Sequence, residues 1–348
     1  MTSLVRKWRA ASLTAGAAVA LLAAVPALAQ DAAGDYRVYI ANEFGADITV
    51  IDTATDKVIN DISISGRPGE VRPRGEAVSP DGKTIYVSVS DFYPERQTPE
   101  DKIVAIDVDS NKVTGEFTAG GNPERVAVTP DGKQIWASLE ATAQGAGYDA
   151  ATGKQIAIFP VGIEAEGVAV SPDGKWVYIS AEATHTVSIV DAQKLKVVKH
   201  LMVGNRPRVV EFSVDGTKAY VTAEIGGTIS VIDTATQKVT KTINLGLDSR
   251  PVQIAVDPNG KRLFVAGGGT SAVYVIDTAT NAITDTIKEN MGRRPWGIAI
   301  TPDGKKLYTA NGLSDSVSVI DTATLKVVDN IPAGRGAHSA AIGVIPAK

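Results

Sequence analysis

GVAVSPDGKWVYISAEATHTVSIVDAQKLKVVKHLMVG, residues 167–204, is the clearest copy of a module that recurs seven times after residue 36 with a period of about 42 to 44 residues. Three marks follow the repeat independently: an aromatic residue, an Asp that closes a hydrophobic run, and a Pro that Ala replaces twice. The aromatic residues are Tyr39, Tyr86, Trp136, Tyr178, Tyr220, Phe264 and Tyr308; the Pro marks are Pro73, Pro123, Ala165, Pro207, Pro251, Pro295 and Ala337. A period of this length, built from short strands, is typical of a β-propeller.

Each module reads as four strands. Residues 168–170 form a short, wholly apolar strand, and 171–174 (SPDG) form a tight turn in which Gly accepts a positive φ. Residues 176–180 are rich in β-formers, 187–190 lead to Asp191, and 197–203 return to the next module. Four antiparallel strands with no helical pattern predict one propeller blade, so the sequence predicts an all-β, seven-bladed fold.

The ends of the chain predict how the ring closes. There are six turns of the SPDG type for seven aromatic marks, so the first blade lacks its inner strand. Residues 339–344 match the inner-strand pattern but have no blade after them. We expect them to pair beside Tyr36–Asn42 and close the ring, which hides both sheet edges. Residues 30–348 are therefore predicted to be one propeller domain.

Residues 1–29 are predicted to be a secretory signal peptide. Arg6, Lys7 and Arg9 precede a short Ala/Leu/Val run that ends in the A-x-A site Ala27–Ala29. No second hydrophobic span follows, so we expect an exported protein without a membrane span, in the periplasm or outside the cell. The chain has no cysteine, which excludes disulfides and a lipoprotein anchor.

Charge and motifs narrow the function classes. Removing the three leader cations from a net charge of −4 leaves −7, which argues against general nucleic-acid binding. Three scattered histidines and no cysteine make no zinc or copper pattern, and no G-x-S-x-G elbow is present. We therefore expect no cofactor, no bound metal and no catalytic set, in a protein that we expect to be monomeric.

The residues beside the Pro marks depart from the repeat. If the inner strands line the channel, these residues surround its mouth on one face, called the top. Those before the mark are Arg72, Asn122, Glu164, Arg206, Arg250, Arg294 and Gly336, and those after it are Arg74, Glu124, Glu166, Arg208, Val252, Trp296 and His338. Six are arginine, and Glu43, Glu140, Glu182 and Glu224 end second strands on the same face.

Two interpretations of this ring stay open. One is a structural network of salt bridges between blades. The other is an anion-binding mouth, in which Arg forks hold a carboxylate or phosphate. The candidate ligand-binding residues are Arg72, Arg74, Arg125, Arg206, Arg208, Glu211, Arg250, Arg294, Trp296 and His338. Glu211 replaces an inner-strand Ala, so we expect Arg206 or Arg208 to pair with it.

Blade two carries two insertions that we expect at one edge of the mouth. Eight extra residues lengthen the loop 91–100, and the loop 66–73 is about five residues longer than most of its equivalents. Phe92, Tyr93 and Arg96 are candidates for a lid or for docking a partner, because loops carry function more often than cores do.

The strings YIANE (39–43), VSVIDTAT (317–324), SPDGK and RPRG resemble those of YVTN-repeat β-propellers, over the whole mature chain. Within that superfamily, residues 204–239 and 293–321 resemble the propellers associated with PQQ-dependent alcohol catabolism. That resemblance implies a periplasmic accessory to a quinoprotein dehydrogenase system, and not a quinone-binding enzyme. The family is also similar to the haem-binding propeller of nitrite reductases, but seven blades and scarce histidines disfavour haem.

Three hypotheses follow. The first is a non-enzymatic binding or scaffold protein whose mouth holds an anionic small molecule or a periplasmic partner protein. The second is a propeller lactonase or lyase that uses Glu211, His338 or the Glu ring with a divalent metal. The third is adhesion at the cell surface, which the absence of an anchor-like sequence after Ile345 disfavours.

Overall fold

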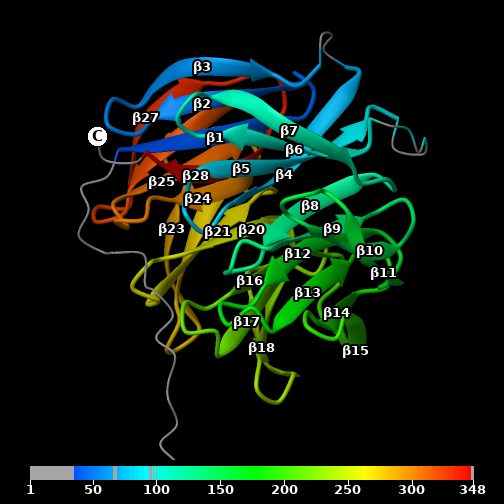
Figure 1. The fold of residues 1–348 in the computed structure, drawn as a ribbon. Coiled ribbons are helices and arrows are strands. Elements are labelled where there is room, and N and C mark those ends of the chain that lie inside the picture. Colours follow the sequence, from blue (N-terminus) through cyan, green and yellow to red (C-terminus); the bar gives the residue numbers. More distant parts are fainter. Residues whose placement is uncertain (1–34, 66–68, 94–95, 97, 99, 346–348) are drawn as a thin grey trace, which may run out of the picture.

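The computed structural model describes residues 35–65, 69–93, 96, 98 and 100–345. They form seven four-stranded antiparallel sheets arranged as the blades of a propeller (Figure 1). The predicted signal peptide, residues 1–29, lies outside the described residues. No helix in the described ranges is long and apolar enough to cross a membrane.

In each blade the strands run outward from the channel in chain order, except that the C-terminal strand β28 is the innermost strand of blade 1. Blade 1 has β28 (Ala337–Val344), β1 (Tyr36–Asn42), β2 (Asp47–Asp52) and β3 (Lys57–Ser63). Blade 2 has β4 (Val71–Val78), β5 (Thr84–Asp91), β6 (Lys102–Asp107) and β7 (Lys112–Thr118), and blade 3 has β8 (Pro123–Val128), β9 (Gln134–Leu139), β10 (Gln144–Asp149) and β11 (Gln155–Pro160). Blade 4 has β12 (Ala165–Val170), β13 (Trp176–Ala181), β14 (Thr186–Asp191) and β15 (Lys196–Met202).

The remaining three blades repeat the pattern. Blade 5 has β16 (Pro207–Phe212), β17 (Lys218–Ala223), β18 (Thr228–Asp233) and β19 (Lys238–Asn244). Blade 6 has β20 (Pro251–Val256), β21 (Arg262–Gly267), β22 (Ala272–Asp277) and β23 (Ala282–Ile287). Blade 7 has β24 (Pro295–Ile300), β25 (Lys306–Asn311), β26 (Ser316–Asp321) and β27 (Lys326–Pro332), and a 3₁₀ turn, η1 (Leu247–Ser249), precedes β20.

The predicted ring closure is confirmed. Strand β28 pairs antiparallel with β1, with Tyr36 opposite Val344 and Tyr39 opposite Ala341. In Figure 1 the red C-terminal strand lies beside the blue N-terminal one, which joins the two ends of the ring. Blade 1 is thus built from both ends of the chain: β1 gains an inner neighbour, and β28 becomes the innermost strand of the sheet.

The aromatic marks hold neighbouring blades together. Six of the seven side chains are at most 1 % exposed, and Tyr86 is half-buried. Tyr178 of blade 4, for example, packs in one cluster with Val210, Phe212 and Val221 of blade 5. These residues therefore have a structural role, and burial of such rings is a large part of what joins the blades.

The SPDG turns form as predicted, and a second type of turn follows the third strand. In the SPDG turn of blade 4, Gly174 has φ 69°, and Ser171 accepts a hydrogen bond from the Trp176 amide (2.9 Å). The Asp that closes the third strand is a hairpin cap, as Asp321 shows by accepting from Thr324 N and Oγ1 at 2.7 Å each. These residues serve the backbone, so they are not free for chemistry.

Candidate functional site

The residues before the Pro marks occupy a special backbone conformation. Six of the seven have positive φ, between 42° and 69°, and Arg72 alone does not. They are Asn122, Glu164, Arg206, Arg250, Arg294 and Gly336. Gly or Asn would suit this left-handed region best, yet three blades place Arg there. Long side chains are therefore held at the mouth at a small conformational cost.

Salt bridges link blades 1, 2 and 3 on one side of the mouth. Arg74, on β4, contacts Glu43 of blade 1 (Nη1–Oε1, 2.7 Å) and Glu124 of blade 3. Arg72 contacts Glu43 at 3.3 Å and donates to Asn122 Oδ1 at 3.1 Å. Burial alone would lower the pKa of the Arg74 guanidinium, but the carboxylates around it outweigh that and raise the pKa.

A second network continues the first through blades 4 and 5. Arg208, on β16, lies among the carboxylates of Glu166 (3.4 Å), Glu182 and Glu224 (3.7 Å). Arg206 contacts the last two, at 2.7 and 3.5 Å. We call the ion pairs of blades 1–5, made by Arg72, Arg74, Arg206 and Arg208, the paired arc. In the paired arc, the arginines therefore form the salt bridges between blades that the first interpretation of the ring predicts.

Arg125, on β8, is a buried cation outside these pairs. It is 7 % exposed, and no described residue accepts a hydrogen bond from its Nε or Nη2. Burial and the charges of Arg208 and Arg74 lower its pKa, while the carboxylates of Glu166 and Glu124 oppose that effect. Its charge lowers the pKa of three groups on other blades: Glu76, Glu211 and His338.

The two inner-strand carboxylates line the channel. Burial raises the pKa of Glu211 to about 7 and that of Glu76 to about 8, and Arg125 lowers both. Glu76 also accepts a hydrogen bond from Ser339 Oγ at 2.8 Å, while no described group bonds its Oε1.

The expectation that Glu211 pairs with Arg206 or Arg208 is wrong. No ion pair within the described ranges joins Glu211 to either arginine, because both point to the carboxylates of the paired arc. The attraction that Glu211 feels comes from Arg125 instead.

Blades 6, 7 and 1 carry a different surface, which we call the open arc: Arg250, Arg294, Trp296 and His338. Within the described part of the chain, neither of these arginines has an ion pair. Arg294 stacks over Trp296 (4.4 Å from Cζ to the ring centroid), as does Arg208 (4.8 Å). Trp296 and His338 lie with ring centroids 5.5 Å apart.

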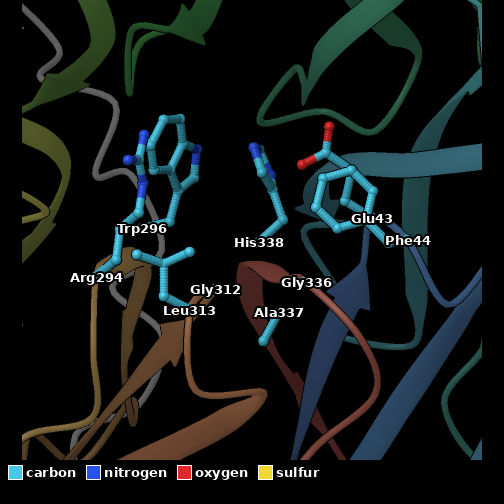
Figure 2. Close-up of a pocket in the computed structure, with 9 residues that line it drawn as sticks. All are labelled: Glu43, Phe44, Arg294, Trp296, Gly312, Leu313, Gly336, Ala337 and His338. Carbon is cyan, nitrogen blue, oxygen red and sulfur yellow. The ribbon is translucent and has the colours of Figure 1, made fainter.

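A cavity of about 220 Å³ opens on this arc. Arg294, Trp296, Leu313, His338, Glu43 and Phe44 contribute its side-chain walls (Figure 2). Trp296 and His338 stand side by side, and Phe44 lies beyond His338. Phe44 and Leu313 are exposed, at 41 and 58 %. Sequence reasoning missed both, although each is a large apolar residue where blades 3 and 4 have Ala141 and Ala183.

The insertions of blade 2 meet as expected. The Phe92 amide donates to Glu70 O at 3.1 Å, which joins the two long loops. Phe92 packs edge-on against Tyr93, and Arg96 lies 4.3 Å over the Tyr93 ring. Arg72 donates to Asp91 O at 3.4 Å, so the described part of the loop borders the paired arc. A lid or docking role for it stays a prediction.

Three carboxylates of the mouth lie close enough together to hold a metal ion. Ligand atoms of Glu124, Glu140 and Glu166 are all within 4.8 Å of one another. Each carboxylate already has a protein partner: Arg74 contacts Glu124, Asn122 donates to Glu140, and Arg208 contacts Glu166. Burial and neighbouring carboxylates raise the pKa of Glu124, whereas burial is outweighed at Glu166 by the surrounding arginines, which lower its pKa. A cation here would have to compete with guanidinium groups.

Comparison with known proteins identifies the class. The family model described as YNCE-like beta-propeller matches residues 84–259, half of the chain. The chain therefore belongs to the YNCE-like β-propeller family. No curated protein matches it.

Solved structures share the fold at low identity. A chain of hydrazine synthase from Kuenenia stuttgartiensis is 21 % identical, with a TM-score of 0.67 over 81 % of this chain and 97 % of its own. A protein of unknown function from Desulfotomaculum acetoxidans is 19 % identical, with a TM-score of 0.74 over 90 % and 99 %. A candidate 6-phosphogluconolactonase from Bacteroides fragilis is 18 % identical, with a TM-score of 0.71 over 89 % and 98 %. At these identities the likeness concerns the fold alone.

Proposed function

We propose that this propeller is an exported, non-enzymatic binding protein whose top face holds an anion, either a small molecule or an acidic group of a periplasmic partner. The observation that carries the proposal is Arg125. A buried guanidinium whose Nε and Nη2 have no partner among the described residues is costly, and an incoming anion would satisfy it. The paired arc supports the site by holding the surrounding charges in place.

The proposal is tested by anion titration of the mature protein. We expect phosphate or succinate to bind in isothermal titration calorimetry and Arg125→Gln to weaken binding at least tenfold, since a hydrogen bond to a charged group contributes about 1.5–3 kcal/mol. Lys305→Gln removes an exposed charge far from the mouth and should change nothing. If protein purified from the periplasm carries no ligand in native mass spectrometry and binds no anion, small-molecule binding is ruled out.

The partner form of the proposal draws on the resemblance to propellers of PQQ-dependent alcohol catabolism. It predicts that a quinoprotein dehydrogenase and its cytochrome are encoded nearby, and that the tagged propeller retains that dehydrogenase from a periplasmic extract. Changing Arg206, Arg208 and Arg294 together to Ala should abolish retention. A triple variant that is folded and keeps every ligand and partner would contradict the whole proposal.

A metal-dependent lactonase or lyase is the second candidate. The grouping of Glu124, Glu140 and Glu166 favours it. The dialysed protein would then retain a divalent metal in elemental analysis and hydrolyse lactones, and Glu140→Gln would abolish both properties. If the protein holds no metal and hydrolyses no lactone, the enzymatic candidate is ruled out and the binding role is the one that remains.

A further inference from the structure

Two neighbouring side chains of the open arc, His338 and Trp296, have buried ring nitrogens without hydrogen-bond partners in the described part of the chain. His338 is 4 % exposed, yet neither of its ring nitrogens has a partner among the described residues. The buried Nε1 of Trp296 likewise has none there. An indole N–H can only donate, and a neutral imidazole keeps one donor. Both N–H groups therefore call for an acceptor, and the two rings lie close enough, with centroids 5.5 Å apart, for one ligand to reach both.

The electrostatic surroundings favour a charged acceptor. Burial lowers the pKa of His338 well below its usual value, and the charges of Arg74, Arg125 and Arg208 lower it further. His338 is therefore neutral at pH 7, in a region where the largest charge effects on it all come from arginines. Arg294 adds a further cation against Trp296. An anion gains more here than a neutral acceptor would.

The cavity also has apolar walls that suit an apolar body. Phe44 and Leu313 line the cavity, and both are exposed. Its volume of about 220 Å³ suits a small organic molecule better than a single water. Glu43 lines the cavity on the side of Phe44, so a second negative group on the ligand would be repelled.

We propose that this pocket binds a small planar monocarboxylate, an aromatic or conjugated acid. Its carboxylate accepts hydrogen bonds from Trp296 Nε1 and from the protonated ring nitrogen of His338, and its ring packs against Phe44 and Leu313. This inference rests on the proposed anion-binding function, because it names the ligand class and the blades that hold it.

The test is calorimetry on the mature protein with four probes: benzoate, benzyl alcohol, acetate and phthalate. We expect benzoate to bind at least tenfold more tightly than benzyl alcohol, which lacks the charge, and than acetate, which lacks the ring. Phthalate should bind more weakly than benzoate because of its second carboxylate. Equal affinity for benzoate and benzyl alcohol would overturn the inference.

Variants separate the hydrogen bond from the packing. Trp296→Phe keeps an aromatic ring but loses the N–H, and we expect it to weaken benzoate binding about tenfold. Its matched control, Trp176→Phe, lies outside the mouth and should bind as the parent does. Leu313→Ala should weaken binding several-fold, whereas Leu247→Ala, an exposed apolar residue of the top face outside the cavity, should not.

The outcomes distinguish this inference from the function on which it rests. If phosphate or succinate binds in an Arg125-dependent way while benzoate does not bind, anion binding stands and the planar-acid pocket is wrong. If Trp296→Phe, shown to be folded by circular dichroism, binds benzoate like the parent, the assigned hydrogen bond is wrong. If no anion and no partner binds, both proposals fall.

Discussion

The paired arc and the open arc occupy equivalent positions of the same repeat but use them differently. In the paired arc, Arg208 lies among three carboxylates, and its side chain is only 5 % exposed. In the open arc, Arg294 stacks on an indole, and His338 and Trp296 have nitrogens without a described partner. A position that stabilises the ring in one blade is thus available for binding in another.

The contrast shows how a symmetric scaffold becomes a directional site. Buried ion pairs fasten blades to one another, and the guanidinium and carboxylate groups that form them are already engaged with each other. Where the carboxylates are missing, the same backbone positions carry unpaired donors beside exposed apolar side chains. Function in this propeller is therefore expected where pairing stops.

The largest effect should come from breaking the paired arc. Arg208→Met leaves Glu166, Glu182 and Glu224 short of a cation, and we expect a loss of unfolding free energy of about 3–5 kcal/mol. Chemical denaturation at pH 7 measures it. A loss below about 1 kcal/mol would mean that the network is not what holds blades 4 and 5 together.

A somewhat smaller effect concerns the channel carboxylate Glu76. Its pKa is raised from 4.5 to about 8, so its contribution to stability is fully present below pH 4.5 and is lost as pH rises to about 8. At pH 9, Glu76→Gln should therefore be more stable than the parent, with the advantage shrinking toward pH 5. Thermal unfolding between pH 5 and 9 measures this, with the exposed Glu289→Gln as control. Identical pH profiles for the parent and Glu76→Gln would refute it.

Arg206 tests whether exposure weakens an ion pair within the same arc. Its side chain is 42 % exposed, against 5 % for Arg208, although both contact Glu182 and Glu224. We expect Arg206→Gln to cost about 1 kcal/mol and to depend on salt. A cost equal to that of Arg208→Met would show that burial does not distinguish the two.

The smallest stability effect belongs to the open arc. Arg294→Gln loses a stacking contact at a partly exposed site, so unfolding free energy should change by less than about 1 kcal/mol. Anion affinity should nonetheless fall several-fold in calorimetry. A large loss of stability with unchanged affinity would reverse the assignment of the two arcs.

Much of the fold could be predicted because it is local and repeated. The β12–β15 hairpins, the SPDG turns and the closing pairing of β28 with β1 follow from strand patterns and from counting copies. The site was only partly predictable. The candidate residues were found as departures from the repeat, but the partner of Glu211 was wrong, and Phe44 and Leu313 were missed.

By itself, the sequence determined the seven-bladed ring and the face on which its copies differ, since strand alternation, turn residues and period are properties of neighbouring residues. Only the tertiary structure decided which arginines are neutralised and which are not. That depends on distances between blades and on the direction of long side chains, which a repeat alignment does not contain. The Arg-rich mouth thus separates into an arc of ion pairs and an arc without them among the described residues, with Arg125, whose Nε and Nη2 have no described partner, between the carboxylates of the first.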